Sequence, residues 1–284
     1  MSWPNQKIKA AYDECRRIAQ SHYENFPVGS FLVPKALRPH VYALYAFMRT
    51  ADDFADLPGR NPDERLHLLA EWREHLSQAS SYDPPSSPIF LALQHTIQSF
   101  TLSRKPFDLL LDAFEFDAHG EVRFETYQEL HFYTQRSAEP VGQLVLALFG
   151  YRDEERVRYS NDICTALQLI NFMQDAKADL SETRCYFPQE DMNLFGLKSC
   201  EDILNSPSAP RLVLQQCHRI ESLLVSGSRL PEMVTGRLRY ELRAILAGAW
   251  IMLGKIRAIG GDTIHQRPML SPRERRLVLF KALG

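Results

Sequence analysis

One stretch of the chain decides the fold: Gln168-Leu169-Ile170-Asn171-Phe172-Met173-Gln174-Asp175-Ala176-Lys177-Ala178-Asp179. Its polar residues Asn171, Asp175 and Asp179 recur every four residues within an apolar helical pattern, so a helix places all three on one stripe. Like charges at this spacing destabilise a helix by about 0.2–0.5 kcal/mol per pair. The stripe therefore indicates a bound counter-charge. For a single pair of acids, a solvated face would be the better interpretation.

A second acidic stripe favours the bound counter-charge. It lies in Tyr45-Ala46-Phe47-Met48-Arg49-Thr50-Ala51-Asp52-Asp53-Phe54-Ala55-Asp56, where Tyr45, Arg49, Asp52 and Asp56 share one helical face. Two such helices can face each other across a bundle and build a site from facing side chains. Oxygen ligands without His or Cys suit Mg²⁺, which completes its shell with water and substrate phosphate. The sequence therefore predicts a diphosphate held by magnesium.

These two segments resemble the acidic motifs of the squalene/phytoene synthase family of isoprenoid enzymes. Tyr-Ala-Phe-Met-Arg stands before Asp52-x-x-x-Asp56, and Ala-Leu-Gln-Leu-Ile stands before Asn171-x-x-x-Asp175-x-x-x-Asp179. The resemblance runs from about His22 to the C-terminal helices. It implies an all-α fold in which residues 1–284 form a single isoprenoid synthase domain, a large helical bundle around a central apolar pocket.

The resemblance also implies roles for individual residues. The expected metal ligands are Asp52, Asp56, Asn171, Asp175 and Asp179. Arg49 and Arg184 match arginines that contact diphosphate, although either could simply pair with a nearby carboxylate.

Aromatic and polar residues of the pocket follow from the same resemblance. Tyr45, Tyr133 and Tyr186 match tyrosines that line the reaction centre, where a ring face stabilises passing positive charge. The alternative for each is an ordinary core position. The remaining matches are His22 and Phe26 in the family's entrance motif, without its usual serines, and Gln168 as a pocket glutamine.

Two further stretches resemble the bacterial hydroxysqualene synthases of hopanoid biosynthesis. They are Glu24-Asn25-Phe26-Pro27-Val28-Gly29-Ser30, followed by Leu37-Arg38-Pro39-His40, and Arg136-Ser137-Ala138-Glu139-Pro140-Val141-Gly142. The expected reaction is Mg²⁺-dependent ionisation of presqualene diphosphate with capture by water, after handover from a presqualene diphosphate synthase. The sequence contains no Gly-rich nucleotide-binding motif, so we expect no nicotinamide cofactor. The alternatives are condensation of two farnesyl or geranylgeranyl diphosphates and, from another class, a non-catalytic helical assembly factor.

Composition restricts the partners and the compartment. A net charge of −2 without a Lys/Arg tract gives no argument for nucleic acid. The five cysteines have no C-x-x-C spacing and indicate neither a disulfide framework nor a zinc site, so a reducing cytosol is expected. His40 and His95 also lack ligand spacing and should be solvated or packed. No signal peptide or membrane span is present, which predicts a soluble cytoplasmic protein.

Helical periodicity extends along the whole chain. Helices are predicted over 8–23, 35–56, 63–80, 88–100, 106–119, 127–149 with a break or kink at Pro140, 153–180, 212–224, 231–259 and 272–283. Residues 181–209 are expected to be irregular and to form a functional lid. The last helix contains the basic amphipathic run 273–281, for which packing on the bundle is favoured and contact with the inner face of an anionic membrane is the alternative.

Overall fold

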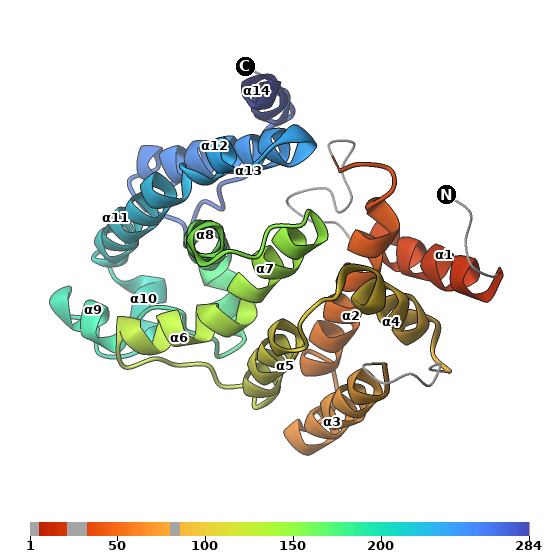
Figure 1. Ribbon diagram of the computed structural model, residues 1–284. Coiled ribbons are helices and arrows are strands. Elements are labelled where there is room, and N and C mark those ends of the chain that lie inside the picture. The colour runs from red at the N-terminus through yellow and green to blue at the C-terminus, as the bar shows by residue number, and fades with distance from the viewer. Residues whose placement is uncertain (1–5, 22–32, 80–85, 284) are drawn as a thin grey trace. The chain divides into compact units, whose positions relative to one another are not determined.

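All the named secondary-structure elements in the part of the chain that the structure describes are helices (Figure 1). The computed structural model describes residues 6–21, 33–79 and 86–283. Within these ranges the only β-type pairing is an isolated parallel bridge between Val122 and Arg184. None of the helices in these ranges combines the length and the apolar character needed to cross a membrane. The chain divides into two compact units, Met1–Ala118 with Gln143–Arg152, and His119–Gly142 with Asp153–Gly284.

Within the described residues, unit 1 contains five complete helices and the C-terminal part of a sixth. The five are α1 (Gln6–Ser21), α2 (Arg38–Ala55), α3 (Pro62–Ala79), α4 (Pro88–Phe100) and α5 (Lys105–Ala118). Prolines stand in the first turns of α2 and α4, where a missing N–H costs no helical hydrogen bond. These bounds confirm the predicted helices to within about three residues.

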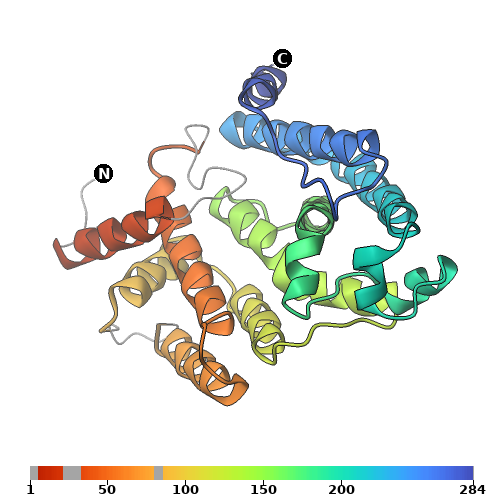
Figure 2. The same ribbon diagram turned by 180° about the vertical axis from the view of Figure 1, so that it is seen from behind.

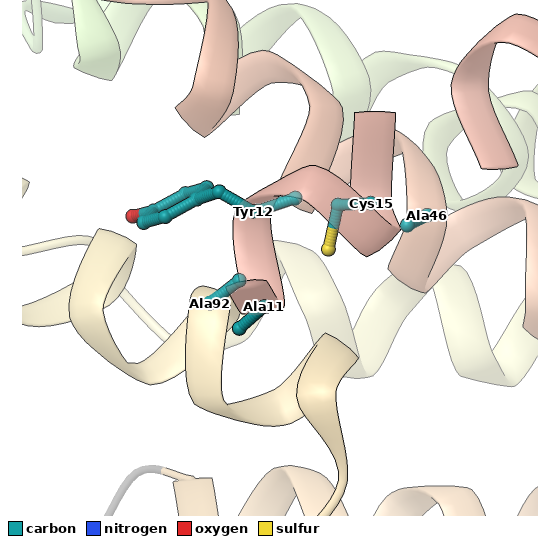
Figure 3. Packing of buried hydrophobic residues seen from close by; sticks show 6 residues of the cluster. Ala11, Tyr12, Cys15, Ala46 and Ala92 are labelled. Atoms are coloured by element: carbon teal, nitrogen blue, oxygen red, sulfur yellow. The ribbon is translucent and has the colours of Figure 1, made fainter. Parts of the chain in front are cut away.

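Small side chains let α1, α2 and α4 pack closely (Figure 3). Ala11, Cys15, Ala46 and Ala92 are all at most 2% exposed. Larger rings fill the space among α2, α3 and α4. The Trp72 ring lies 4.4 Å from that of Phe90, and its indole N–H donates to the carbonyl oxygen of Phe47 at 3.3 Å. The core of unit 1 therefore combines short interhelical distances with aromatic packing.

A buried polar cluster joins α1, α2 and α4. The hydroxyl of Tyr12 lies 2.9 Å from Nδ1 of both His40 and His95, and 2.8 Å from Oγ1 of Thr96. His40 is only 1% exposed. Burial, together with the neighbouring His95, lowers the pKa of His40 from 6.5 to about 4. The cluster therefore holds a neutral imidazole in the core, as a packed histidine, which was one of the two expectations.

The pKa of His40 predicts a loss of stability in acid. Because the folded state holds the neutral ring, the stabilisation is complete above pH 6.5 and is lost as the pH falls toward about 4. We expect the free energy of unfolding to fall by about 2 kcal/mol from pH 7 to pH 5 through this residue. Urea unfolding at both pH values measures the difference. The His40→Gln variant should show a shallower pH dependence, and an identical slope in both proteins would contradict the assignment.

Unit 2 is arranged around one long helix. Its elements are α6 (Tyr127–Ser137), the start of α7 (Glu139–Leu148), α8 (Glu154–Ser181), α9 (Gln189–Leu194), α10 (Cys200–Asn205), α11 (Ala209–Gly227), α12 (Leu230–Met233), α13 (Gly236–Ala258) and α14 (Pro272–Leu283). The carboxylate of Asp153 caps α8 by accepting from the N–H of Arg156 at 3.1 Å. Helices α6, α11 and α13 all pack on α8, which Figure 1 shows end-on.

The structure confirms one predicted helix break and corrects two other predictions. The break near Pro140 occurs at Ala138, between α6 and α7. The single helix predicted over 231–259 is wrong, because Val234 and Thr235 are extended and Gly236 has φ 63°, so α12 and α13 are separate. The segment 181–209 contains the short helices α9 and α10 instead of being irregular. Helices of six residues are too short to give a clear apolar period.

A buried ion pair holds α9, within the segment 181–209, in place. Asp191 on α9 is 2% exposed and accepts hydrogen bonds from Arg219 on α11, at 2.9 Å for Oδ1, and from Gln216 at 3.0 Å. The guanidinium of Arg219 also lies 4.2 Å from the ring centroid of Tyr127 on α6. Removing one partner of a buried ion pair leaves an uncompensated charge. Helix α9 is thus fixed to α11.

Candidate functional site

The acidic stripe of unit 2 lies on α8. Asn171, Asp175 and Asp179 are partly exposed, whereas Leu169, just before the stripe, and Met173, within it, are fully buried. Gln168 precedes Asn171 by one turn and is also partly exposed. The helix therefore presents these oxygen-bearing side chains along one face, while its apolar residues lie in the core of the unit.

An arginine that the sequence interpretation missed pairs with this stripe. Nη2 of Arg267, in the segment between α13 and α14, lies 2.5 Å from Oδ1 of Asp175. Beside this pair, the side-chain amide of Gln174 donates to the carbonyl oxygen of Pro268 at 2.9 Å. The segment is far from α8 in sequence, and no helical period links the two. Part of the counter-charge inferred for the stripe is thus supplied by the protein.

Aromatic rings gather next to the stripe. The ring of Phe172 stacks on that of Tyr186 with centroids 3.7 Å apart and an interplanar angle of 3°. The ring of Tyr133 lies 6.0 Å from Tyr186 and 6.3 Å from Phe172. The structure thus brings together two tyrosines chosen from the sequence, and adds Phe172, which follows Asn171 directly. All three are less than 8% exposed.

Arg184 follows α8 in a fixed backbone conformation. Thr183 adopts φ 61°, a left-handed conformation that ends the helix. The N–H of Arg184 donates to the carbonyl oxygen of Asp179 at 2.8 Å, and that of Cys185 donates to Val122 at 2.8 Å. The side chain of Arg184 is 18% exposed, with Nη2 3.7 Å from the carboxylate of Glu182. Arg184 is therefore held at the end of the acidic stripe.

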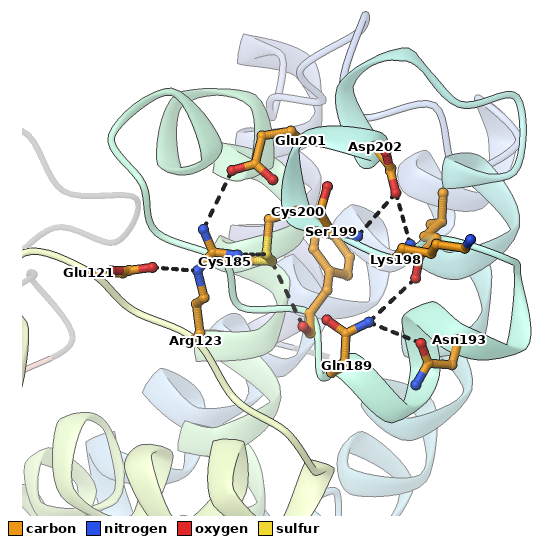
Figure 4. The surroundings of a disulfide bond; sticks show 12 residues. Glu121, Arg123, Cys185, Gln189, Asn193, Lys198, Ser199, Cys200, Glu201 and Asp202 are labelled. Atoms are coloured by element: carbon orange, nitrogen blue, oxygen red, sulfur yellow. Dashed lines mark hydrogen bonds and ion pairs between the residues drawn. A yellow bond between two sulfur atoms is a disulfide. The ribbon is translucent and has the colours of Figure 1, made fainter.

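A disulfide joins Cys185 to Cys200 (Figure 4). The expectation that the cysteines form no disulfide is wrong for this pair. The chain turns back through α9 and places the two Cα atoms 6.1 Å apart, a relation that cysteine spacing does not reveal. Arg123 contacts Cys200 with Nη1 3.6 Å from Sγ and pairs with Glu121 at 2.7 Å. Cys15, Cys164 and Cys217 are free.

The disulfide predicts a redox-dependent stability. It closes a loop with a sequence separation of 15 residues, for which chain entropy gives about 3 kcal/mol. We expect reductant to lower the free energy of unfolding by about this amount in the wild-type protein. The Cys200→Ser variant should start at the lower value and show no response to reductant. Denaturant titrations with and without reductant measure both, and a wild-type protein that ignores reductant would contradict the prediction.

The acidic stripe of unit 1 lies at the end of α2. Nη1 of Arg49 is 3.2 Å from Oδ2 of Asp52, and Nη2 is 2.5 Å from Oδ1 of Asp53. Asp56 forms the C-cap of α2 and its N–H donates to the carbonyl oxygen of Asp52 at 3.1 Å. Tyr45 is 9% exposed. Arg49, Asp52 and Asp53 thus form one charged group within unit 1.

Some predictions for the site remain predictions. The two stripes belong to different units, so their expected meeting across a bundle is an inference from the sequence. His22 and Phe26 lie outside the described residues, as does the stretch 24–30. The expected single domain also stays a prediction.

The oxygen donors of the two stripes match a hard divalent cation in type. Among the described residues, no three or more His, Cys, Asp or Glu side chains gather into a ready metal site. Carboxylates of both stripes nevertheless attract positive charge, since Asp175 holds Arg267 at 2.5 Å and Asp52 holds Arg49 at 3.2 Å. Carboxylate and amide oxygens without His or Cys are the donor set that Mg²⁺ prefers.

Comparison with known proteins identifies the class. Residues 19–274 match the model of the squalene/phytoene synthase family, and the chain belongs to this family. It is 31% identical to the hydroxysqualene synthase of Sinorhizobium fredii over 91% of this chain and 87% of that protein. The crystal structure of squalene synthase HpnC from Alicyclobacillus acidocaldarius superposes with a TM-score of 0.83, at 36% identity over 90% of this chain and 96% of that one. The predicted all-α isoprenoid synthase fold is confirmed.

Similarity also extends to a synthase with another product. The presqualene diphosphate synthase of Rhodopseudomonas palustris is 28% identical over 170 residues. The chain spans 60% of the length of that protein in this match, and the match covers 60% of this chain. The family is thus established, while the reaction is a matter for proposal.

Proposed function

We propose that the protein converts presqualene diphosphate and water into hydroxysqualene and diphosphate. The observation that carries this proposal is the position of the Tyr133, Phe172 and Tyr186 rings beside the acidic stripe of α8. The substrate is an apolar isoprenoid chain that carries a diphosphate. A site that ionises it needs groups that hold the leaving diphosphate, next to a surface that stabilises a carbocation. Similarity to a hydroxysqualene synthase over most of the chain supports this choice among family reactions.

The stripe residues bind and orient the leaving group in this proposal. Asp52, Asp56, Asn171, Asp175 and Asp179 would hold Mg²⁺, whose positive charge stabilises the diphosphate as its bond to carbon breaks. Arg49 and Arg184, with Arg267, supply guanidinium groups that suit phosphate oxygens. The carbon–oxygen bond breaks with its electron pair passing to the diphosphate.

The aromatic residues protect the cation that remains. Ring faces carry negative potential and attract positive charge, so Tyr133 and Tyr186 stabilise the rearranging carbon skeleton. Their burial, with that of Phe172, keeps bulk water away until rearrangement is complete. One water oxygen then forms the new carbon–oxygen bond and releases a proton. No hydride is consumed, so no nicotinamide cofactor takes part, and a presqualene diphosphate synthase supplies the substrate by handover.

Condensation of two prenyl diphosphates is the second candidate. It is favoured by the similarity to a presqualene diphosphate synthase. Incubation with Mg²⁺ and either presqualene diphosphate or farnesyl diphosphate, without nicotinamide cofactor, distinguishes the two by mass spectrometry. Hydroxysqualene from presqualene diphosphate alone is the expected result. Consumption of farnesyl diphosphate that stops at presqualene diphosphate, or formation of phytoene from the C20 diphosphate, would support condensation. Absence of both turnover and diphosphate binding would support an assembly factor.

A further inference from the structure

Helix α14 has one face that is used for packing. It packs against α13, and both views draw it near one end of that helix (Figures 1 and 2). Val278 is 7% exposed and Ala282 is fully buried. Glu274 is fixed on the same side, because Nζ of Lys255 on α13 lies 2.9 Å from both of its carboxylate oxygens. Ser271 and Glu274 also cap the helix reciprocally.

The opposite face of α14 has a different composition. At 100° per residue, Arg273, Arg276, Leu277 and Phe280 fall on the side away from Val278 and Ala282, whereas Lys281 falls beside Glu274 at the edge of the packing face. Phe280 is 77% exposed and Leu277 is 43% exposed. The helix carries four cationic residues and one acid, Glu274, although the whole chain has a net charge of −2. We call the four outward residues, Arg273, Arg276, Leu277 and Phe280, the outer face of α14.

The outer face is continuous in sequence with the segment that contacts the acidic stripe. Met269, two residues after Arg267, is 52% exposed. Arg267 pairs with Asp175, and Pro268 accepts from Gln174, so this segment joins α8 to the start of α14 within unit 2. A surface bound by α14 would thus lie close along the chain to the residues proposed to hold diphosphate.

We propose that the outer face of α14, with Met269, docks on an anionic lipid bilayer. A single exposed apolar residue is normal on a protein surface. Here two large apolar side chains are flanked by two arginines, Arg273 and Arg276, with no acid on that face, which is the pattern of a helix lying in a membrane interface. The cations complement lipid phosphates, while Leu277 and Phe280 reach below the headgroups. Two apolar side chains are few for the core of a stable protein–protein interface.

The docking proposal deepens the proposed function, since it rests on an isoprenoid lipid as substrate that can arrive from a bilayer. Vesicle binding is measured without substrate turnover, so the docking proposal and the proposed reaction can fail independently of each other. Sedimentation of the full chain with vesicles of phosphatidylglycerol and phosphatidylcholine is the test. We expect binding to these vesicles, weak binding to pure phosphatidylcholine, and loss of binding at high salt.

Two variants and one matched control complete the test. Phe280→Ser combined with Arg276→Glu should weaken vesicle binding at least tenfold. Leu194→Ser removes a residue that is 71% exposed on α9, compared with 77% for Phe280, and should bind as the wild type does. Circular dichroism confirms folding of each. The proposal is overturned by a wild-type protein that stays in the supernatant, by equal loss in the control, or by a Phe280-dependent protein dimer in place of vesicle binding.

Discussion

Replacing Asp175 or Asp179 by Ala should reduce turnover of presqualene diphosphate by at least about a thousandfold, as expected for loss of a group that stabilises the leaving charge. Both side chains are partly exposed on α8. Removing Asp179 from its like-charged i, i+4 pair with Asp175 should leave stability unchanged or raise it by about 0.2–0.5 kcal/mol. Asp175→Ala also loses the ion pair with Arg267, which adds at most about 1 kcal/mol. For Asp179→Ala, activity and stability are therefore expected to move in opposite directions, which a purely structural role would not produce.

Steady-state kinetics and thermal unfolding of the same preparations measure this separation. Lys177→Ala is the matched control, because Lys177 stands between the two acids on α8 but is exposed and off their face. It should retain wild-type turnover. We expect Asp52→Ala and Asp56→Ala to behave as the α8 variants do. Turnover by the wild-type protein in excess chelator would overturn the assignment of these residues to Mg²⁺.

Asp53 should differ from its neighbours. Its carboxylate accepts from Nη2 of Arg49 at 2.5 Å, and it lies about 100° around the helix from Asp52. Loss of this contact in Asp53→Ala would alter the position of Arg49 without removing an expected metal ligand. We expect the Asp53 variant to lose less turnover than Asp52→Ala in the same kinetic assay.

The predictable part of the fold is the part that depends on local periodicity. Helix α8 follows from apolar residues at helical spacing and a cap at Asp153, and the predicted range 153–180 agrees with Glu154–Ser181. The predicted range 272–283 agrees with the observed α14, Pro272–Leu283, which has Pro272 in its first turn. The acidic stripe on α8 needs only the helical repeat, since Asn171, Asp175 and Asp179 are one turn apart.

The remainder depends on tertiary contacts that no local period encodes. The stack of Phe172 on Tyr186 requires the chain to turn back after Thr183. The disulfide of Cys185 with Cys200 requires α9 to be fixed by Asp191 and Arg219, whose pairing joins distant segments. Gly236 could have signalled the break before α13, since a left-handed φ suits glycine.

Arg267 pairs with the α8 stripe in a way that the sequence does not reveal, and its replacement carries the second large expected effect. The pair with Asp175 is surface-exposed, with Arg267 56% and Asp175 36% exposed, so it adds at most about 1 kcal/mol to stability. If the guanidinium passes from Asp175 to the diphosphate when substrate binds, Arg267→Ala should lower kcat/KM about a hundredfold. Arg267→Lys keeps the charge without the fork and should recover part of this loss.

Arg267→Ala should raise the Mg²⁺ affinity of the substrate-free protein, although it lowers kcat/KM. In the wild-type protein Arg267 and a divalent cation compete for the carboxylate of Asp175, so Arg267→Ala should bind Mg²⁺ up to about fivefold more tightly. Calorimetric titration measures this change. Arg60→Ala is the matched control, because Arg60 is 54% exposed and pairs with Glu64 at 2.7 Å. Unchanged kcat/KM with unchanged Mg²⁺ affinity would leave Arg267 as an ordinary surface ion pair, whereas slower turnover with tighter metal binding requires a cation that leaves Asp175 during the reaction.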